Sequence, residues 1–368
     1  MNDMKTFKLA YFMFLFLTNS LLFGQNEALR KEIDKIIRYD TDIDYDKTPG
    51  FIIGILDNDS TYFLSFGTSK KGQNVSFIKD DIFEIGSVSK LFTSSLIRLA
   101  EEEGLLTLDE KVNENFPPEY RNPRLNDLQI TDLVNHQSGL PLRPLFFGKK
   151  QKDGQDPYAE YQNSDLLKFY KNFVPSDKKF EYSHTNYALL ELILEHKYKS
   201  SLQDVLAKKL LPTLGMEHTF IDFAETKNNI LVPGYDRSMK VVAPWKYSSF
   251  RGSEGVKSCT SDMISFIKSH MNISQTKLDD VLGAGFTDED FESFNDKLSI
   301  NNGWHQVNRQ NFKIFMHTGR TSGHNVFVGM VRETKTAVVI MANSSVGTGD
   351  LGFQVLRLIN YNWKRDNS

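Results

Sequence analysis

Cysteine is almost absent from this sequence, which holds a single one, Cys259, among 368 residues. Because one thiol cannot close an internal disulfide, the fold has to be stabilised by its packed core, and a chain of this length can bury one. The chain also lacks an excess of charge of either sign, since 44 basic and 47 acidic residues give a formal net charge of −3. With no run of lysine and arginine either, the sequence predicts no nucleic-acid partner.

Long apolar runs are confined to the N-terminus. Lys5 and Lys8 precede an apolar stretch over residues 9–23, which is followed by Gly24. A basic start, a short apolar run and a small residue at its end are typical of a secretory signal peptide. The run is short for a membrane span, which needs about 20 residues. We therefore expect residues 1–24 to be a signal peptide and residues 25–368 to be a secreted or periplasmic domain; a membrane becomes a partner only if the segment stays uncleaved.

Metal-ligand spacing is missing as well. The eight histidines are spread singly, without an H-E-x-x-H or H-x-H pattern that would place two imidazoles on one ion. The sequence therefore predicts no metal site, and no other cofactor is implied. Nothing in it indicates an oligomeric state.

Apolar runs at both ends of the domain predict strands. Two such runs flank an Asn/Asp-rich turn at residues 57–60 and predict a β-hairpin over residues 50–67. Strands at both ends with helical patterns between them indicate an α+β fold: one antiparallel sheet built from N- and C-terminal segments, flanked by helices, with a mostly helical insertion at roughly residues 105–260. The C-terminal strands are expected at residues 312–317, 325–331 and 336–342.

Two stretches have weak patterns. Residues 143–179 are polar and charged with scattered aromatics, and we expect this segment to form the rim of a cleft rather than part of a core. Residues 279–296 are acidic, and we expect them to be rich in loops.

A serine and a lysine stand three residues apart where a helix is expected to begin. Ser87 and Lys90 precede apolar residues that recur at helical spacing, so Lys90 should project beside Ser87. Unpaired N–H groups at a helix N-terminus favour developing negative charge. A weak nucleophile, a neighbouring amine and a positive pole are what acyl transfer requires. Ser-x-x-Lys alone is also compatible with a simple N-cap beside a solvated lysine.

Two further stretches carry reactive residues. Tyr182 precedes an expected helix and is a candidate proton carrier, because a phenol beside an ammonium group is more easily ionised. His317, Thr318 and Gly319 end an expected strand, which we take to be an edge strand whose glycine lets the backbone approach a substrate. The N–H of Arg320 could then face the N–H of Ser87 and form a two-donor oxyanion hole.

Taken in this order, Ser87-x-x-Lys90, Tyr182 and His317-Thr318-Gly319 resemble the motifs of the serine β-lactamase and penicillin-binding protein superfamily. The branch with class C β-lactamases, D-Ala-D-Ala carboxypeptidases and related esterases is the most similar. The resemblance covers roughly residues 28–360 and implies the same α+β fold. Flanking segments agree with it: the hairpin at residues 50–67, His136-Gln137-Ser138-Gly139-Leu140-Pro141, Leu214-Gly215-Met216 and Gly303-Trp304.

Two positions depart from the family pattern. The tyrosine motif usually reads Y-x-N, and here the third position is His184; Asn186 points elsewhere from a helix and is not expected to replace it. The β-lactamases usually have lysine where this chain has His317, whereas several carboxypeptidases and esterases of the branch have histidine. We expect both histidines to contact the substrate or the catalytic residues.

The resemblance implies a secreted serine hydrolase that forms an acyl-enzyme. Ser87 would be the nucleophile, with Lys90 and Tyr182 as proton carriers that titrate together. His184, His317, Thr318, Gly319 and Arg320 would bind the substrate or its oxyanion. The substrate would be a small molecule or peptide: an ester, a D-amino-acid peptide or a β-lactam. The alternative is a penicillin-binding or sensor protein that is acylated but does not turn over.

Overall fold

The computed structural model describes residues 27–145, 147, 156, 158–175, 180–222, 230–286, 292–295, 298–309 and 312–360. The segment expected to be a signal peptide, residues 1–24, lies outside these ranges. Within them, no helix is both long enough and apolar enough to cross a membrane.

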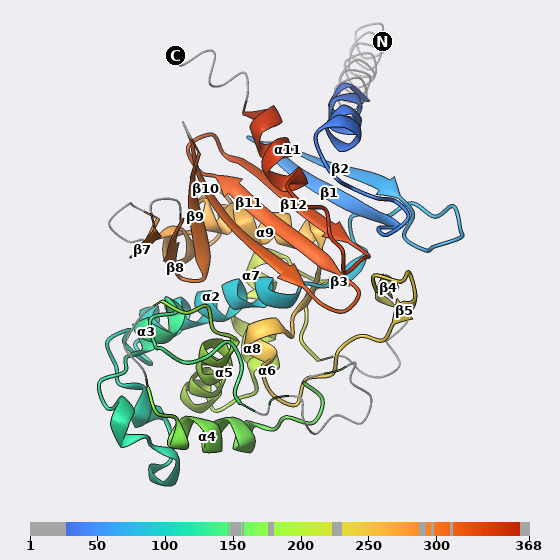
Figure 1. The fold of residues 1–368 in the computed structure, drawn as a ribbon. Helices are drawn as coiled ribbons and strands as arrows, with labels where there is room; N and C mark the ends of the chain where they lie inside the picture. The colour runs from blue at the N-terminus through green and yellow to red at the C-terminus, as the bar shows by residue number, and fades with distance from the viewer. Residues whose placement is uncertain are drawn as a thin grey trace, which may run out of the picture.

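In the described ranges the central sheet contains eight strands: β1 (Gly50–Asp57), β2 (Ser60–Gly67), β7 (Glu292–Asn295), β8 (Leu298–Asn301), β9 (Trp304–Arg309), β10 (Phe312–Arg320), β11 (Asn325–Val331) and β12 (Thr336–Ala342). Their order across the sheet is β2-β1-β12-β11-β10-β9-β8-β7, and every neighbouring pair is antiparallel (Figure 1). β1 lies between β2 and β12, with Ile53 opposite both Leu64 and Ile340. Strands from the two ends of the chain therefore form one sheet.

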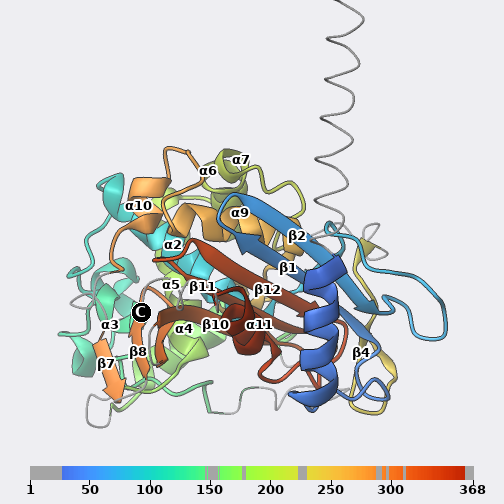
Figure 2. The ribbon, with the colours of Figure 1, turned by 90° about the horizontal axis from the view of Figure 1, so that it is seen from above.

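Helices cover both faces of this sheet (Figures 1 and 2). A helix over residues 27–39 and α11 lie on one face, and α9 and α2 lie on the other. α3, α4, α5, α6 and α8 form a second lobe next to α2. The helices are α2 (Ser89–Glu102), α3 (Ile130–Val134), α4 (Asn163–Asn172), α5 (His184–Tyr198), α6 (Leu202–Lys209), α7 (Leu211–Leu214), α8 (Arg251–Glu254), α9 (Thr260–His270), α10 (Asp279–Gly283) and α11 (Leu351–Ile359), with short 3₁₀ turns η1 (Gly86–Val88), η2 (Val112–Asn115), η3 (Pro118–Tyr120) and η4 (Pro123–Leu125).

Burial on both faces explains the almost wholly apolar sequence of β1. Its Ile52 belongs to the core that contains the buried faces of α2 and α9. Phe51 and Ile53 point to the opposite side, into the core that contains the helix over residues 27–39 and α11. Successive strand residues face opposite sides, so a strand covered twice has no position left for a polar side chain.

The fold class predicted from the sequence is confirmed, including the hairpin at residues 50–67 and the three C-terminal strands. Two local predictions were wrong. Residues 143–179 contain α4, and Tyr158 and Tyr170 are fully buried in the core, because their rings pack against Phe250 and Phe116 instead of facing solvent. The acidic stretch 279–296 contains α10 and β7, because β8 supplies β7 with a pairing partner.

Candidate active site

Ser87 lies in the tight turn η1, which joins strand β3 (Ile82–Glu84) to α2. β3 is fixed by pairing with β6 (Lys257–Cys259), and Ile85 and Val88 on either side of the serine are fully buried. The α-helix begins at Ser89, two residues later than expected, so Ser87 stands in the turn just before it. Its own side chain stays half-buried. The nucleophile expected from the sequence is thus held on a rigid turn and remains accessible.

Lys90 is fully buried in the first turn of α2. Its Nζ donates to the carbonyl of Ser253 at 3.1 Å and lies 5.0 Å from the centre of the Tyr182 ring. Burial lowers the pKa of Lys90 to about 7, although the charge of Glu254 acts in the opposite direction. Near neutral pH a large fraction of Lys90 is therefore an uncharged amine that can accept a proton.

Tyr182 lies two residues before α5, where the Ser183 hydroxyl caps the helix by accepting from the N–H of Asn186. Burial raises the pKa of Tyr182, and this effect outweighs the neighbouring Ser87 side chain, which lowers it. The expectation that a neighbouring ammonium would ease its ionisation was therefore wrong: burial favours the neutral forms of both Tyr182 and Lys90.

Glu254, at the end of α8, contacts the nucleophile and was not found from the sequence. The Ser87 hydroxyl donates to its Oε1 at 3.0 Å, and Nδ1 of His184 lies 2.7 Å from the same oxygen. Oε2 accepts from the Tyr158 hydroxyl and lies 3.6 Å from the Arg143 guanidinium. Burial opposes ionisation of Glu254, but contact with His184, the charge of Lys90 and the Tyr158 hydroxyl outweigh it and lower the pKa of Glu254 to about 2. A carboxylate thus stands beside Ser87.

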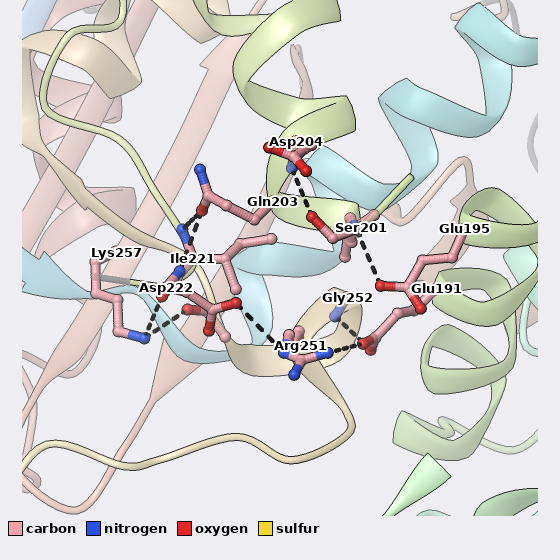
Figure 3. Close-up of polar contacts among 12 residues, drawn as sticks. Glu191, Glu195, Ser201, Gln203, Asp204, Ile221, Asp222, Arg251, Gly252 and Lys257 are labelled. Atoms are coloured by element: carbon pink, nitrogen blue, oxygen red, sulfur yellow. Dashed lines mark hydrogen bonds and ion pairs between the residues drawn. The ribbon is translucent and has the colours of Figure 1, made fainter. Parts of the chain in front are cut away.

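A polar network fixes α8 in place (Figure 3). The fully buried carboxylate of Glu191, on α5, accepts from the N–H of Gly252 at 3.0 Å and contacts Arg251 at 3.4 Å. Arg251 also lies 3.6 Å from Asp222. From α2, the hydroxyl of Thr93 donates to the carbonyl of Gly252 at 2.7 Å. These contacts hold the short helix so that Glu254 faces the turn carrying Ser87.

The histidines around Tyr182 are uncharged at neutral pH. Burial, helped by the charge of Lys90, lowers the pKa of His184 to about 4 and that of His305 to about 4. His317 is also buried, and its pKa is well below the ordinary value because of burial and its neighbour His305. Nδ1 of His317 donates to the carbonyl of Thr318 at 2.7 Å, so Nε2 carries a lone pair. That nitrogen has no hydrogen-bond partner among the residues described.

The end of β10 packs directly against the turn η1. A Cβ added to Gly319 would lie 1.9 Å from the carbonyl oxygen of Ile85, and one added to Gly86 would lie 2.7 Å from the amide nitrogen of Arg320. The N–H of Thr321 donates to the carbonyl of His324, and amides alternate along a strand, so the N–H of Arg320 points away from β11. The backbone N–H groups of Ser87 and Arg320 can therefore face one oxyanion.

β10 is not an edge strand of the sheet, contrary to expectation. It pairs with β11 on one side and with β9 on the other, but β9 pairs only with residues 312–316. Residues 317–320 therefore have no partner in β9, and this part of β10 packs against η1 instead. Thr318 is exposed here, as is Arg320.

The structure brings together most of the side chains expected at the site. The Tyr182 ring lies 5.6 Å from that of His184 and 6.2 Å from that of His317. Asn186 lies elsewhere: its amide group bonds Ser138 and the carbonyl of Leu133. Sequence reasoning missed Glu254, Tyr158, Arg143 and His305, because no local spacing connects them with Ser87.

One group of side chains has the composition of a metal site. Asp80, His218 and Cys259 place their potential ligand atoms within 4.8 Å of one another, and no other such group occurs in the described part of the chain. The Ser261 hydroxyl already contacts Asp80 at 2.6 Å and the sulfur of Cys259 at 3.1 Å. Burial raises the pKa of Cys259 to about 12, so it is a thiol. This group includes none of the residues around Ser87.

Comparison with known sequences identifies a family and several relatives. A sequence model of the beta-lactamase family matches residues 38–359. Beta-lactamases from Pseudomonas fluorescens and Psychrobacter immobilis are 25% and 26% identical over 228 and 256 residues, which are 61% and 67% of this chain. The matched segments span only 60% and 59% of those relatives. The unguisins hydrolase of Aspergillus violaceofuscus is 21% identical over 81% of this chain and 59% of its own length.

Solved structures share the fold. A beta-lactamase/D-alanine carboxypeptidase from Pseudomonas syringae has a TM-score of 0.76 at 20% identity, covering 91% of this chain and 98% of that one. A class C beta-lactamase in complex with cefoxitin has a TM-score of 0.77 at 22% identity, covering 92% and 99%. At these identities the likeness concerns the fold alone.

Proposed function

The chain belongs to the beta-lactamase family, and from this premise we propose that it is a serine hydrolase that works through an acyl-enzyme on Ser87. The observation that carries the proposal is the surroundings of Ser87: its side chain neighbours Tyr182, and the centre of the Tyr182 ring lies 5.0 Å from Nζ of a buried Lys90 whose pKa is about 7. A hydroxyl becomes a useful nucleophile when a nearby base can take its proton.

In the proposed reaction Ser87 Oγ attacks the substrate carbonyl carbon, and its proton passes to the Lys90–Tyr182 pair. The oxyanion is held by the N–H groups of Ser87 and Arg320, a type of contact that contributes about 3–4 kcal/mol in serine hydrolases. Tyr182 then protonates the leaving group. Water cleaves the ester of Ser87 and releases the acid product.

We further propose that the acyl group comes from a neutral ester or a D-amino-acid derivative rather than from a β-lactam with a carboxylate. At position 317 the site has an uncharged imidazole with a free lone pair, and Glu254 adds a carboxylate next to Ser87. Both features disfavour an anionic substrate group. One relative is named as an unguisins hydrolase, so the relatives include a hydrolase not named for β-lactams.

The test compares kcat/KM for a short-chain aryl ester and a chromogenic cephalosporin, with Ser87→Ala as the inactive control. We expect the ester to be the better substrate. A preference for the cephalosporin by more than about tenfold, equivalent to about 1.4 kcal/mol, would contradict the ester proposal and identify a β-lactam hydrolase. An adduct that forms on Ser87 and persists for hours would instead identify an acylated sensor.

The N-terminal sequence supports the further proposal that the enzyme acts outside the cytoplasm. Its basis is the basic start and short apolar run of residues 1–24.

A further inference from the structure

Each oxygen of the Glu254 carboxylate accepts a hydrogen bond in the free protein and lies near a basic side chain. Oε1 faces Ser87 and His184, while Oε2 faces Tyr158 and Arg143. Only 3% of the residue is exposed, so solvent does not replace any of these partners. The Ser87 hydroxyl is the one partner that the proposed reaction changes chemically.

Acylation of Ser87 removes that partner. An ester oxygen carries no hydrogen, so in the acyl-enzyme Oε1 of Glu254 loses the bond that Ser87 donates. A buried carboxylate oxygen left without a donor is unfavourable, and the natural replacement is a water molecule. Because Ser87 is half-exposed, water can reach this position from the cleft. Since Oε1 lies 3.0 Å from Oγ, such a water would lie close to the acyl carbon attached to Oγ.

We propose that Glu254 is a catalytic residue of deacylation, which binds the hydrolytic water and accepts its proton. This inference rests on the proposed acyl-enzyme. The water oxygen forms a bond to the acyl carbon, and the bond between that carbon and Oγ of Ser87 breaks. One water proton passes through Glu254 to Oγ, and the other remains on the carboxylic acid product. Ser87 then donates to Oε1 again, as in the resting protein.

The surroundings of Glu254 favour release of a proton that it has accepted. Contacts with His184, Lys90 and Tyr158 stabilise the ionised form, so Glu254 passes the proton on to the more basic alkoxide of Ser87. His184 lies at the position where the family usually has asparagine and contacts Oε1 at 2.7 Å. We assign it as a positioning residue, because it reaches the reaction only through Glu254.

The test separates the two half-reactions with p-nitrophenyl acetate at pH 8.5, where Lys90 is largely neutral. Burst kinetics give the acylation rate, and mass spectrometry of the intact protein follows the acetyl adduct. In Glu254→Gln, Tyr158 and Arg143 hold the amide oxygen, so the NH₂ group faces Ser87 and the acceptor is lost. We expect acylation within about threefold of wild type, deacylation slower by about 10²–10⁴-fold, and a persistent adduct.

Asp279→Asn is the matched control, because it neutralises another buried carboxylate, on α10, which bonds Ser269 and Gln275 and does not contact Ser87 or α8. It should leave both half-reactions within about threefold. Hydroxylamine, which needs no base, should release the acetyl group from the Glu254→Gln adduct. Glu254→Asp keeps a carboxylate and should slow deacylation less than Gln does; it replaces the Gln variant if that protein does not fold.

Three results would overturn the inference. In the first, acylation slows and deacylation does not, so that Glu254 serves the first step. In the second, Asp279→Asn slows deacylation as much as Glu254→Gln. In the third, hydroxylamine fails to release the adduct, which indicates a blocked site. Full turnover of the aryl ester by Ser87→Ala would refute the proposed acyl-enzyme itself, a different outcome from these.

Discussion

Nζ of Lys90 donates a hydrogen bond to the carbonyl oxygen of Ser253 at 3.1 Å, which ties the first turn of α2 to α8. Because Ser253 precedes Glu254, a shift of α8 changes the hydrogen-bond partners of both Lys90 and Ser87. The hydrogen bonds of the Lys90 amine and of the Ser87 hydroxyl therefore depend on the placement of one four-residue helix.

Lys90→Ala and Tyr182→Phe should each lower kcat/KM for the aryl ester by about 10²–10⁴-fold, the usual loss when a general base is removed. The double variant should lose much less than the product of the two, because the pair acts as one unit. Tyr187→Phe is the control: this neighbouring phenol bonds Val134 and Ser94 and should leave kcat/KM nearly unchanged. Multiplicative losses would show that Lys90 and Tyr182 act separately.

Activity should rise with pH through about 7, because burial lowers the pKa of Lys90 to about that value and only its neutral form accepts a proton. The charge of Glu254 raises the Lys90 pKa, so Glu254→Gln should move this limb of the acylation rate to lower pH. The pH dependence of the p-nitrophenol burst rate, recorded for the wild type and for Glu254→Gln, measures both the position of this limb and its displacement. A profile that stays flat from pH 5 to 9 excludes Lys90 as the titrating base.

His317→Lys should raise kcat/KM for carboxylate-bearing substrates relative to neutral esters by about tenfold or more, because an ammonium replaces an uncharged imidazole. His317→Gln is the matched control, since it removes the ring without adding charge and should not change the ratio in this direction. If both variants alter the ratio equally, charge at this position does not select the substrate.

Gly319→Ala should lower both activity and stability, because its Cβ would lie 1.9 Å from the Ile85 carbonyl and would push β10 away from η1. Separating the N–H groups of Ser87 and Arg320 should cost about 10²–10³-fold in kcat. Gly104→Ala is the comparison: its φ of +69° makes alanine strained, but nothing lies within 4 Å. That variant should melt earlier while keeping kcat, as measured by thermal unfolding and ester hydrolysis.

N-terminal sequencing of the exported protein should begin near Gln25, as residues 1–24 predict. Replacing Lys5 and Lys8 with glutamate should reduce export, because the basic start of the segment is lost. Recovery of intact Met1 from the membrane fraction would show an uncleaved anchor.

The sequence predicts well those parts of the fold whose pattern lies within one continuous segment. The hairpin at residues 50–67 follows from apolar runs around a turn, and Ser87 and Lys90 follow from helical spacing. Glu254 lies 167 residues from Ser87 and has no local pattern, so only the packing of α8 against η1 brings them together. The shifted pKa values of Lys90 and Tyr182 were also out of reach, because burial causes them and burial is a property of the assembled core.

The pairing of β1 with β12 has a consequence for how the chain folds. Residues 51–57 can pair with β12 only after residues 336–342 have been synthesised, so the sheet cannot close before that point. Such distant pairing slows folding and leaves strand edges open for longer, which favours aggregation. A fragment that stops before residue 336 would leave β1 and β11 without a neighbour each, and we expect it to accumulate as insoluble material rather than as a smaller folded unit.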